Sequence, residues 1–330
     1  MKKTVLTGIK PTGRIHLGNY IGAIKPALEL AQIENPVYFV ADYHGLTKVQ
    51  DAEQMKELSY GIAATWLALG LDPSKSIFYR QSDVPEIFEL SWILACFSSK
   101  GLMNRAHAYK AIVDQNREAG REQDDGVNMG LFTYPILMAS DILLFQSDLV
   151  PVGKDQIQHV EIARDLAETF NRQFGETFKL PEYVVEEESA VLPGLDGRKM
   201  SKSYNNTIPI FEEPDKLRKL INRIKTDSTE PDEAKDPDES IVFALYREFA
   251  SEDEINAMRE RYETGIGWGE AKRELFDVMN DVLEEPRRKY KYYIENLDEI
   301  DRILAEGAGK ARAKVRPLLT DVKRKIGIYV

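Results

Sequence analysis

Cysteine is nearly absent from this chain, and its scarcity limits how the fold can be stabilised. Cys96 is the single cysteine among 330 residues, so an internal disulfide is excluded. Because Cys96 lies in an apolar run, we expect it to be a buried small hydrophobic residue. The one cysteine and four histidines show no metal-ligand spacing, so we expect no structural zinc or iron–sulfur site.

Long hydrophobic runs are also missing. No stretch approaches the roughly 18 apolar residues that a membrane span requires. The N-terminal residues are basic, but the apolar run after them stops at Lys10, which is too short for the hydrophobic region of a signal peptide. Hydrophobic residues make up 43% and charged residues 30% of the chain, an ordinary composition for a soluble protein. We therefore expect a cytoplasmic protein with no membrane partner.

The chain lacks net positive charge, because its formal net charge is −11. Residues 306–330 nevertheless carry seven basic and two acidic side chains, a net charge of +5 that leaves −16 for the remainder. An acidic body with a basic terminal helix can bind a phosphate backbone at one place and repel it elsewhere. A solvated helix face predicts the same composition, so this segment alone leaves nucleic-acid binding open.

The order of apolar segments predicts an α/β domain followed by a helical one. Expected buried strands alternate with expected amphipathic helices, the strands at 4–6, 37–40 and 77–79 and the helices near 18–32, 53–70 and 86–97. This order predicts a Rossmann-like parallel sheet covered by helices. Beyond about residue 210 further helices are expected at 214–225, 239–248, 252–263, 270–295 and 310–326. We place the domains at 1–204 and 205–330.

The segment after the first expected strand lacks the two common phosphate-binding loops. Gly8 and Gly13 have P-loop spacing, but the lysine and the hydroxyl residue of that loop are missing, and no Gly-x-Gly-x-x-Gly occurs. His16 and Asn19 remain, three residues apart at a helix start, where free backbone N–H groups attract phosphate. Gly18 between them permits close approach of a base or a ribose. A helix cap with a core-facing histidine would produce the same pattern.

A second candidate for phosphate binding lies near residue 200. The string 199–203 places Lys199 and Lys202 three residues apart with hydroxyl groups around them, in a glycine-flanked stretch. Such a segment supplies both charge and hydrogen bonds to a triphosphate. An exposed lysine pair is commonly only a solvated surface. A preset five-residue string, however, arises by chance in a chain of this length only about once in ten thousand.

The apolar stretch 130–144 contains one carboxylate. Tyr134, Met138 and Asp141 follow at i, i+4 and i+7 and therefore lie on one helix face. A carboxylate on an apolar face must find a donor or raise its pKa. An indole N–H is a suitable donor, because it donates one hydrogen bond and accepts none, and Met138 would pack against the ring. Pairing of Asp141 with a backbone or arginine donor in the core is the alternative.

The two phosphate-binding candidates resemble the signature motifs of class I aminoacyl-tRNA synthetases. Residues 16–19 and 199–203 occur in the order of those motifs. Asn19 departs from the histidine that commonly ends the first motif, and this departure resembles the tryptophanyl branch. Segments 130–144 and 150–156 resemble the same branch, whereas tyrosyl enzymes commonly have glutamine in place of Met138. A hydrogen-bonding site can reject an analogue that lacks the matching group by a factor of about 10⁴.

The resemblance implies an ATP-dependent ligase that activates L-tryptophan, uses Mg²⁺, and transfers the tryptophanyl group to the 3′ end of tRNA(Trp). It implies catalytic roles for Lys199, Lys202, His16 and Asn19. The residues expected to contact ATP are Lys10, Pro11, Thr12, Gly18, Asn19, Gly153, Lys154, Asp155, Val191, Lys199, Met200, Ser201, Lys202 and Ser203. The residues expected to contact tryptophan are Asp141, Tyr134, Met138, Gln156 and His44, with Tyr134 and Gln156 at its ammonium group.

The resemblance also implies a homodimer whose helical domain binds the tRNA anticodon, with no DNA partner. Tyr290, Tyr292 and Tyr293 adjoin basic side chains in that domain. Their rings can stack on unpaired bases, and packing between helices would explain them equally well.

Three other functions share part of this pattern. A tyrosyl-tRNA synthetase would have the same motifs and is distinguished by Met138. A small-molecule nucleotidylyltransferase shares the first motif but lacks both the second motif and a large helical domain. A non-catalytic, synthetase-like regulator would bind tryptophan or tRNA without forming an adenylate, and the intact Lys199 and Lys202 disfavour it.

Overall fold

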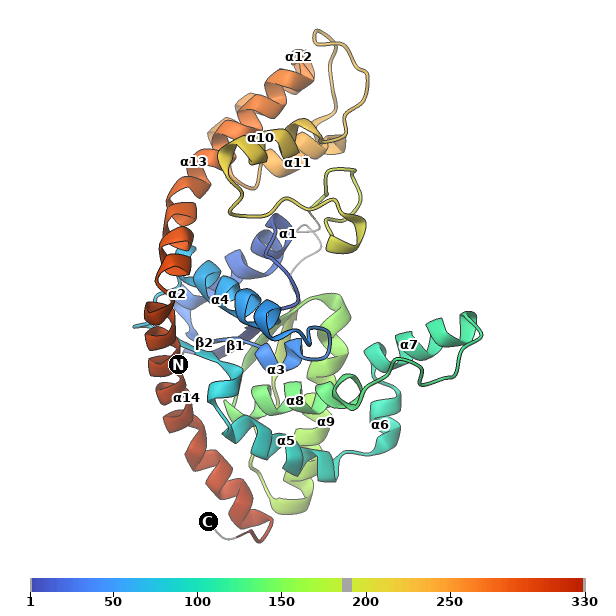
Figure 1. Ribbon diagram of the computed structural model, residues 1–330, viewed down its shortest axis with the longest axis vertical. Coiled ribbons are helices and arrows are strands. Elements are labelled where there is room, and N and C mark those ends of the chain that lie inside the picture. The colour runs from blue at the N-terminus through green and yellow to red at the C-terminus, as the bar shows by residue number, and fades with distance from the viewer. Residues whose placement is uncertain (1, 186–191, 329–330) are drawn as a thin grey trace.

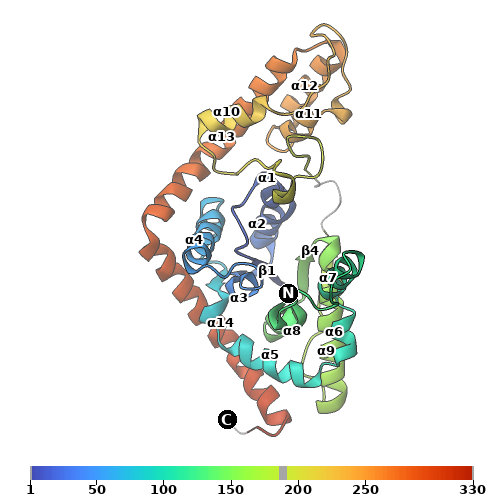
Figure 2. The same ribbon diagram turned by 45° about the vertical axis from the view of Figure 1, so that its right-hand side comes forward.

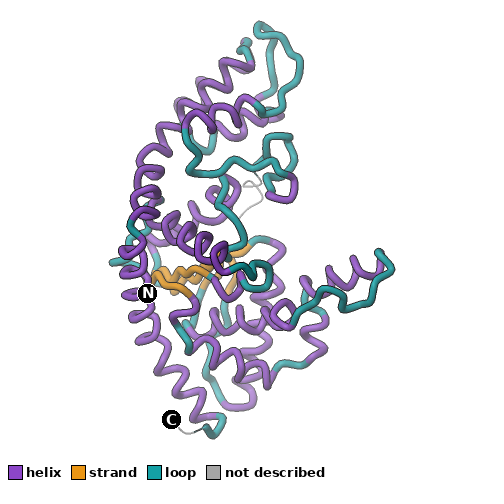
Figure 3. Tube along the Cα trace, viewed as in Figure 1, coloured by secondary structure: helices purple, strands orange, loops and turns teal. Residues whose placement is uncertain are grey.

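A five-stranded parallel sheet forms the centre of the molecule. The computed structural model describes residues 2–185 and 192–328, so the ATP contact expected of Val191 lies outside the described residues. The strands are β1 Thr4–Ile9, β2 Asn35–Val40, β3 Ile77–Arg80, β4 Leu149–Val152 and β5 Glu182–Val185. Figure 3 shows them in orange, enclosed by helices. The predicted α/β class is confirmed.

The strand order is β3-β2-β1-β4-β5, and every neighbouring pair is parallel. The chain therefore moves outward from β1 to β3 and then returns to the other side of β1. Open parallel sheets bind ligands where the order reverses, at the carboxyl ends of the strands. In this sheet that place lies between the ends of β1 and β4.

Helices cover both faces of the sheet and form a second lobe above it (Figure 1). Those that belong to the sheet region are α1 Leu17–Asn19, α2 Lys25–Ile33, α3 Asp42–Gly45, α4 Ala52–Ala68, α5 Glu86–Phe97, α6 Lys100–Asn104, α7 His107–Glu118, α8 Met129–Leu144 and α9 Ile157–Phe174. Those that follow are α10 Pro214–Asn222, α11 Ile241–Tyr246, α12 Glu252–Thr264, α13 Trp268–Glu295 and α14 Leu297–Lys325.

Short non-α turns complete the chain path. A π-helical turn, η1 Tyr20–Ile24, joins α1 to α2, and 3₁₀ turns occur at η2 Gln81–Asp83, η3 Lys154–Gln156, η5 Lys202–Tyr204 and η6 Pro237–Glu239. The turns η2 and η3 begin at or just after the ends of β3 and β4. They therefore carry side chains directly to the ligand-binding edge of the sheet.

Local sequence explains where several helices begin. The side chain of Asp51 accepts a hydrogen bond from the backbone of Gln54 at the start of α4, and Asn128 does the same for Leu131 at the start of α8. Such caps satisfy backbone donors that have no partner within the helix. Strand β2 is apolar and buried along nearly all its length, as expected for a parallel strand that is covered on both faces.

The long helix α13 descends from the second lobe, and α14 continues from its end and runs beside the sheet (Figure 2). A Cβ atom on Gly307 would lie 1.7 Å from the carbonyl oxygen of Phe78 in β3, so this close approach requires glycine. Arg312 and Arg316 bond the carboxylate of Glu86 in α5 at 3.0 and 2.7 Å. Basic residues of segment 306–330 thus help to attach the last helix to the sheet region.

The two regions therefore share elements across the predicted boundary at residue 204. Leu17 of α1 and Met200 are buried in the same apolar cluster as the helices of the second lobe. Conversely, Ile300 and Leu304 of α14 are buried against the sheet. The division into 1–204 and 205–330 remains a prediction, and both α13 and α14 of the second region pack on the first.

The expectation that Cys96 is buried is wrong, because Cys96 is exposed. Helical spacing explains this result: Ile93 and Leu94 face the core, whereas Cys96 shares the outer face of α5 with Trp92, which is 74% exposed. Within residues 2–185 and 192–328, no helix has both the length and the apolar character needed to cross a membrane.

Candidate active site

The first motif forms the N-terminal end of α1, close to the edge where β1 ends. His16 is the residue before the helix and is only 7% exposed. Its backbone N–H donates to the side-chain oxygen of Asn19 at 3.2 Å. A Cβ atom on Gly18 would lie 3.1 Å from the His16 ring, a tight contact that glycine avoids.

The signature loop, defined as residues 199–203, lies directly against this first motif. The backbone N–H of Gly18 donates to the sulfur of Met200 at 3.4 Å, and Met200 is buried. The Nζ atom of Lys202 lies 2.7 Å from where a Cβ of Gly13 would be. Segments separated by more than 180 residues in sequence are therefore brought together, as the phosphate-binding interpretation requires.

A buried asparagine holds the signature loop in place. Asn206 is 2% exposed, and its side-chain oxygen accepts from the backbone N–H of Ser201 at 2.8 Å. Its side-chain nitrogen donates to the carboxylate of Asp196 at 2.7 Å and to the backbone oxygen of Lys199 at 3.2 Å. The sequence did not identify Asn206, because nothing in the string 203–206 separates it from the exposed Asn205 beside it.

Electrostatics at the phosphate end favour an incoming anion. Burial, with a smaller contribution from the charge of Lys202, lowers the pKa of His16 to about 4, so the imidazole is neutral near pH 7. Partial removal from water lowers the pKa of Lys202. Among the described residues no carboxylate offsets that ammonium, whose charge is therefore available to a phosphate. Lys199 and Ser203 are exposed beside it.

The amino-acid end of the candidate site is buried. Asp141 is 1% exposed, and its Oδ2 atom lies 2.8 Å from Nε2 of His44. The side-chain nitrogen of Gln81 donates to both carboxylate oxygens at 2.9 Å. Burial raises the pKa of Asp141, and the bonds from His44 and Gln81 oppose that rise. The donors in the structure are therefore a histidine and an amide. The sequence suggested the indole of a ligand or, alternatively, a backbone or arginine donor in the core.

Gln81 is a member of this cluster that the sequence did not identify. It is the first residue of η2, immediately after β3, and it is fully buried. A lone glutamine has no spacing pattern that marks it as functional. Its position directly after an expected strand is the one signal that could have found it.

Tyr134 connects the amino-acid end to the loop after β1. Its ring packs edge-on against His44, with 6.3 Å between centroids, and Nζ of Lys10 lies 5.7 Å from the ring centre. Its hydroxyl is hydrogen-bonded to Nε2 of the buried His159. The sequence assigned no role to His159, which the structure places behind Tyr134.

A chain of contacts joins the two ends of the site. A Cβ atom on Gly45, the residue after His44, would lie 2.8 Å from the ring of Pro11, which is buried in the loop after β1. The same loop continues to Gly13 and so to Lys202. Asp141 and the first motif therefore lie at the same edge of the sheet. Thr12 is exposed in this loop, and Met138 is half-buried on α8.

The remaining expected contacts follow β4. Gly153 and Lys154 are exposed, and Gln156 is half-buried at the end of η3. Asp155 belongs to the same turn. These residues begin where β4 ends, next to β1, and therefore at the reversal of strand order.

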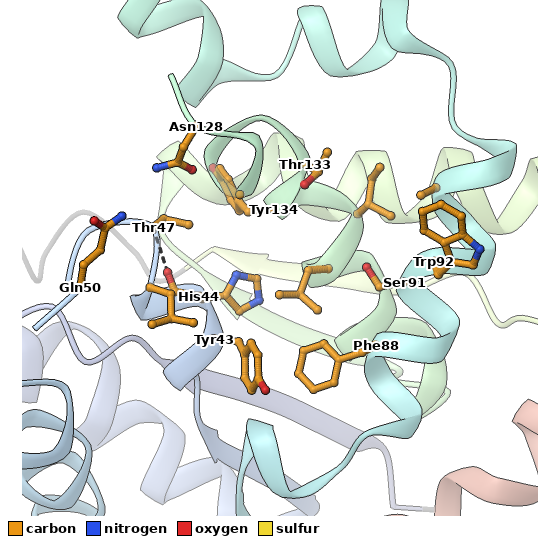
Figure 4. A pocket seen from close by; sticks show the side chains of 15 residues that line it. Tyr43, His44, Thr47, Gln50, Phe88, Ser91, Trp92, Asn128, Thr133 and Tyr134 are labelled. Carbon is orange, nitrogen blue, oxygen red and sulfur yellow. Dashed lines mark hydrogen bonds between the residues drawn. The ribbon is translucent and has the colours of Figure 1, made fainter. Parts of the chain in front are cut away.

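An open cavity of about 510 Å³ borders the amino-acid end. Figure 4 shows His44, Phe88 and Ser91 directed into the space between α3, α5 and α8. Asp141 does not line this cavity; it lies behind His44, to which it is bonded. In the described part of the chain, no group of three or more histidine, cysteine, aspartate or glutamate side chains could hold a metal ion.

Comparison with known proteins finds relatives along nearly the whole chain. Residues 2–284 match the family model described as tRNA synthetases class I (W and Y). The chain is 53% identical to the tryptophan–tRNA ligase of Pseudomonas aeruginosa, over 99% of this chain and 74% of that protein. It is 52% identical to the tryptophan–tRNA ligase of Neisseria meningitidis, over 99% of this chain and 98% of that protein. Tryptophanyl-tRNA synthetase from Campylobacter jejuni, in complex with ADP and tryptophan, matches with a TM-score of 0.90 and 45% identity, covering 98% of this chain and 99% of that one.

Proposed function

The chain belongs to the class I tRNA synthetases for tryptophan and tyrosine, and from that premise we propose that it is an ATP-dependent tryptophan–tRNA ligase. The observation that carries this function is the near full-length identity of about half the residues to ligases specific for tryptophan. The buried Asp141 supports the same amino acid, because an indole N–H can donate to a carboxylate.

The reaction has two steps. A carboxylate oxygen of L-tryptophan attacks the α-phosphorus of ATP, and the bond to the bridging oxygen breaks to release pyrophosphate. A ribose hydroxyl at the 3′ end of tRNA(Trp) then attacks the carbonyl carbon of the adenylate and displaces AMP. Transfer of this kind depends chiefly on positioning and charge neutralisation. We assign neutralisation to Lys199 and Lys202.

The first motif would complete the ATP site. His16 and Asn19 would bind the nucleotide at the start of α1, where backbone N–H groups favour a phosphate. The loop 10–12 and the turn after β4 would contact the rest of ATP from the two sides of the strand-order reversal. In this proposal the neutral His16 donates or accepts a hydrogen bond without repelling a nearby lysine.

Magnesium would enter with the substrate as MgATP. The residues near Lys202 supply ammonium and imidazole groups, and no described cluster offers the carboxylates that a resident magnesium ion prefers. The phosphate oxygens would therefore hold the ion, while Lys199 and Lys202 share the neutralisation of the leaving pyrophosphate.

Recognition of tryptophan would occur at the buried end. Asp141 would accept the indole N–H, Met138 would pack on the ring, and His44 would line the same pocket. Tyr134 and Gln156 would hold the ammonium group. The hydroxyl of Tyr134 is bonded to His159, which fixes the direction of its lone pairs and so favours this role.

The second region, 205–330, would bind the tRNA anticodon. Of its three candidate tyrosines, Tyr290 is stacked on Phe211 with 4.5 Å between ring centroids, and Tyr292 is bonded to Glu299 at 2.7 Å. Packing therefore accounts for Tyr290, whereas Tyr292 is 51% exposed and remains accessible to a base.

We also propose a cytoplasmic homodimer. The outer face of α5 and the start of α8 carry large exposed apolar side chains, with Trp92 74% and Met129 70% exposed. The groove of about 510 Å³ lies on the same side. Exposed apolar surface of this kind is typical of a protein interface.

Pyrophosphate exchange tests the proposed function. The purified chain is supplied with MgATP and labelled pyrophosphate, and either L-tryptophan or L-tyrosine is added. We expect exchange with tryptophan alone, followed by charging of tRNA(Trp). Exchange driven by tyrosine would identify a tyrosyl enzyme, and bound tryptophan without exchange would identify a non-catalytic regulator.

A further inference from the structure

Gln81 makes contacts that suit a role in amino-acid selection. Its side-chain nitrogen lies 2.9 Å from both oxygens of Asp141. A carboxylate can only accept from an amide, so the nitrogen, and not the oxygen, must face Asp141. We propose that Gln81 is a positioning residue that holds the Asp141 carboxylate in place for the indole N–H of tryptophan. This inference rests on the proposed function.

The contact between Gln81 and Asp141 is buried, so water cannot replace either partner. Gln81 is 0% exposed and Asp141 is 1% exposed. A buried carboxylate on an apolar helix requires donors to remain an acceptor for a ligand. His44 bonds one of its oxygens, and Gln81 contacts both. Gln81 therefore restricts rotation of the Asp141 carboxylate about the bond that joins it to Cβ.

The amide also leaves one acceptor unsatisfied. The side-chain oxygen of Gln81 is buried without a hydrogen-bond partner among the described residues. It is bonded to the same carbon as the nitrogen that contacts Asp141. A buried acceptor without a donor is unfavourable, so a donor that approaches it gains a hydrogen bond at little cost. An indole N–H entering here would meet acceptors on Asp141 and Gln81.

The backbone explains why the amide is held so firmly. Gln81 follows β3, whose neighbour β2 ends beside Asp42, and Asp42 accepts from the backbone of Ser82 at 3.1 Å and from its hydroxyl. The ends of β2 and β3 are thereby tied together. His44 and Gln81 project from these two ends onto the same carboxylate.

The test compares L-tryptophan with L-β-(benzothiophen-3-yl)alanine, in which sulfur replaces the indole N–H. For the wild-type chain we expect a clear preference for tryptophan in kcat/KM for pyrophosphate exchange. Gln81→Met keeps the length of the side chain but removes the amide. We expect it to lower the preference about tenfold, through KM for tryptophan. The kcat value and the kinetics of the sulfur analogue should remain nearly unchanged.

A matched control is Gln146→Met, which removes the same amide group from a half-buried glutamine that bonds the backbone of Thr177 and Lys179 at 2.7 Å and does not contact Asp141. It should reduce the melting temperature and leave the preference unchanged. If Gln81→Met does not fold, Gln81→Asn shortens the side chain while keeping the amide, and it should show the same loss of preference.

The inference is overturned if the wild-type preference is absent, or if the folded Gln81 variant retains it or loses both substrates equally. Failure of the proposed function has a different signature, because the wild-type chain would then show no exchange with tryptophan. That result would also overturn this inference. If the wild type is active and the Gln81 variant keeps the wild-type preference for tryptophan, this inference alone is overturned.

Discussion

The two ends of the candidate site differ in how they are built. At the amino-acid end, Asp141 is buried and already bonded to His44 and Gln81. At the phosphate end, Lys199 and Lys202 are exposed, and the loop that carries them is held by Asn206. A buried, fixed carboxylate suits discrimination between similar amino acids. Exposed cations suit a charge that develops and then leaves with pyrophosphate.

Removing a lysine should damage only the phosphate end and have the largest effect. We expect Lys202→Ala to reduce kcat for pyrophosphate exchange by a factor of about 10² to 10³, because an interaction with developing charge is lost. The KM for tryptophan should change less than about threefold. Steady-state exchange measures both values, and Lys219→Ala, on the exposed face of α10, is the control. Equal losses in both parameters would contradict the assigned role.

Removing the carboxylate should damage the opposite end. We expect Asp141→Ala to raise the KM for tryptophan about 10- to 100-fold, because the indole N–H loses its acceptor and Gln81 is left buried without a partner. The KM for ATP should stay within about twofold. Exchange assays at varied tryptophan and varied ATP separate the two effects. An unchanged affinity for tryptophan would exclude Asp141 from the pocket.

The attachment of α14 to β3 allows an indirect test of the difference between the amino-acid end and the phosphate end of the site. We expect Gly307→Ala to destabilise the protein by about 1–3 kcal/mol, because the added methyl group would overlap the backbone of Phe78. Since β3 carries Gln81 at its end, KM for tryptophan should rise more than KM for ATP. Gly309→Ala meets nothing within 4 Å and should be neutral or slightly stabilising. Thermal melting measures the stability of both variants. Equal changes in their melting temperatures would refute this prediction.

The smallest expected effect is the loss of stability that His16 causes when the pH is lowered. His16 has a folded pKa of about 4, below its usual value of 6.5, so between these values the unfolded chain binds more protons than the folded one. Stability from the neutral, buried His16 is therefore fully present above pH 6.5 and is lost as the pH falls toward 4. The melting temperature of His16→Gln should fall less steeply over this range. The exposed His107→Gln is the control, and parallel curves for wild type and His16→Gln would disprove the assignment.

Much of the fold could be predicted from residue periodicity. The first three strands and the helices near 18–32, 53–70, 86–97 and 252–263 occur close to where they were expected. The last helix, however, begins at Leu297 and not at 310. Two glycines, Gly307 and Gly309, precede the expected start at 310, and glycine commonly lowers the expectation of a helix. Gly307 is nevertheless required inside the helix for contact with β3. A tertiary contact of this kind leaves no local signal.

The parts of the candidate site that form contiguous sequence motifs could be predicted from the sequence. Residues 16–19 and 199–203 were found because each is a contiguous motif, and Asp141 because a carboxylate on an apolar face is conspicuous. Gln81, Asn206 and His159 were missed, because each acts through a partner that is distant in sequence. Such residues become visible only in the folded structure, where segments distant in sequence meet.

The position of α14 has a consequence for synthesis of the protein. Strand β3 lies at one edge of the sheet, and the helix that packs on it, α14, follows β3 by more than 200 residues. During translation the nascent sheet must therefore wait for residues 297–325 to leave the ribosome before this edge is covered. An uncovered edge strand can pair with another chain, so a prematurely terminated product should aggregate even though it contains every residue proposed to bind ATP or tryptophan.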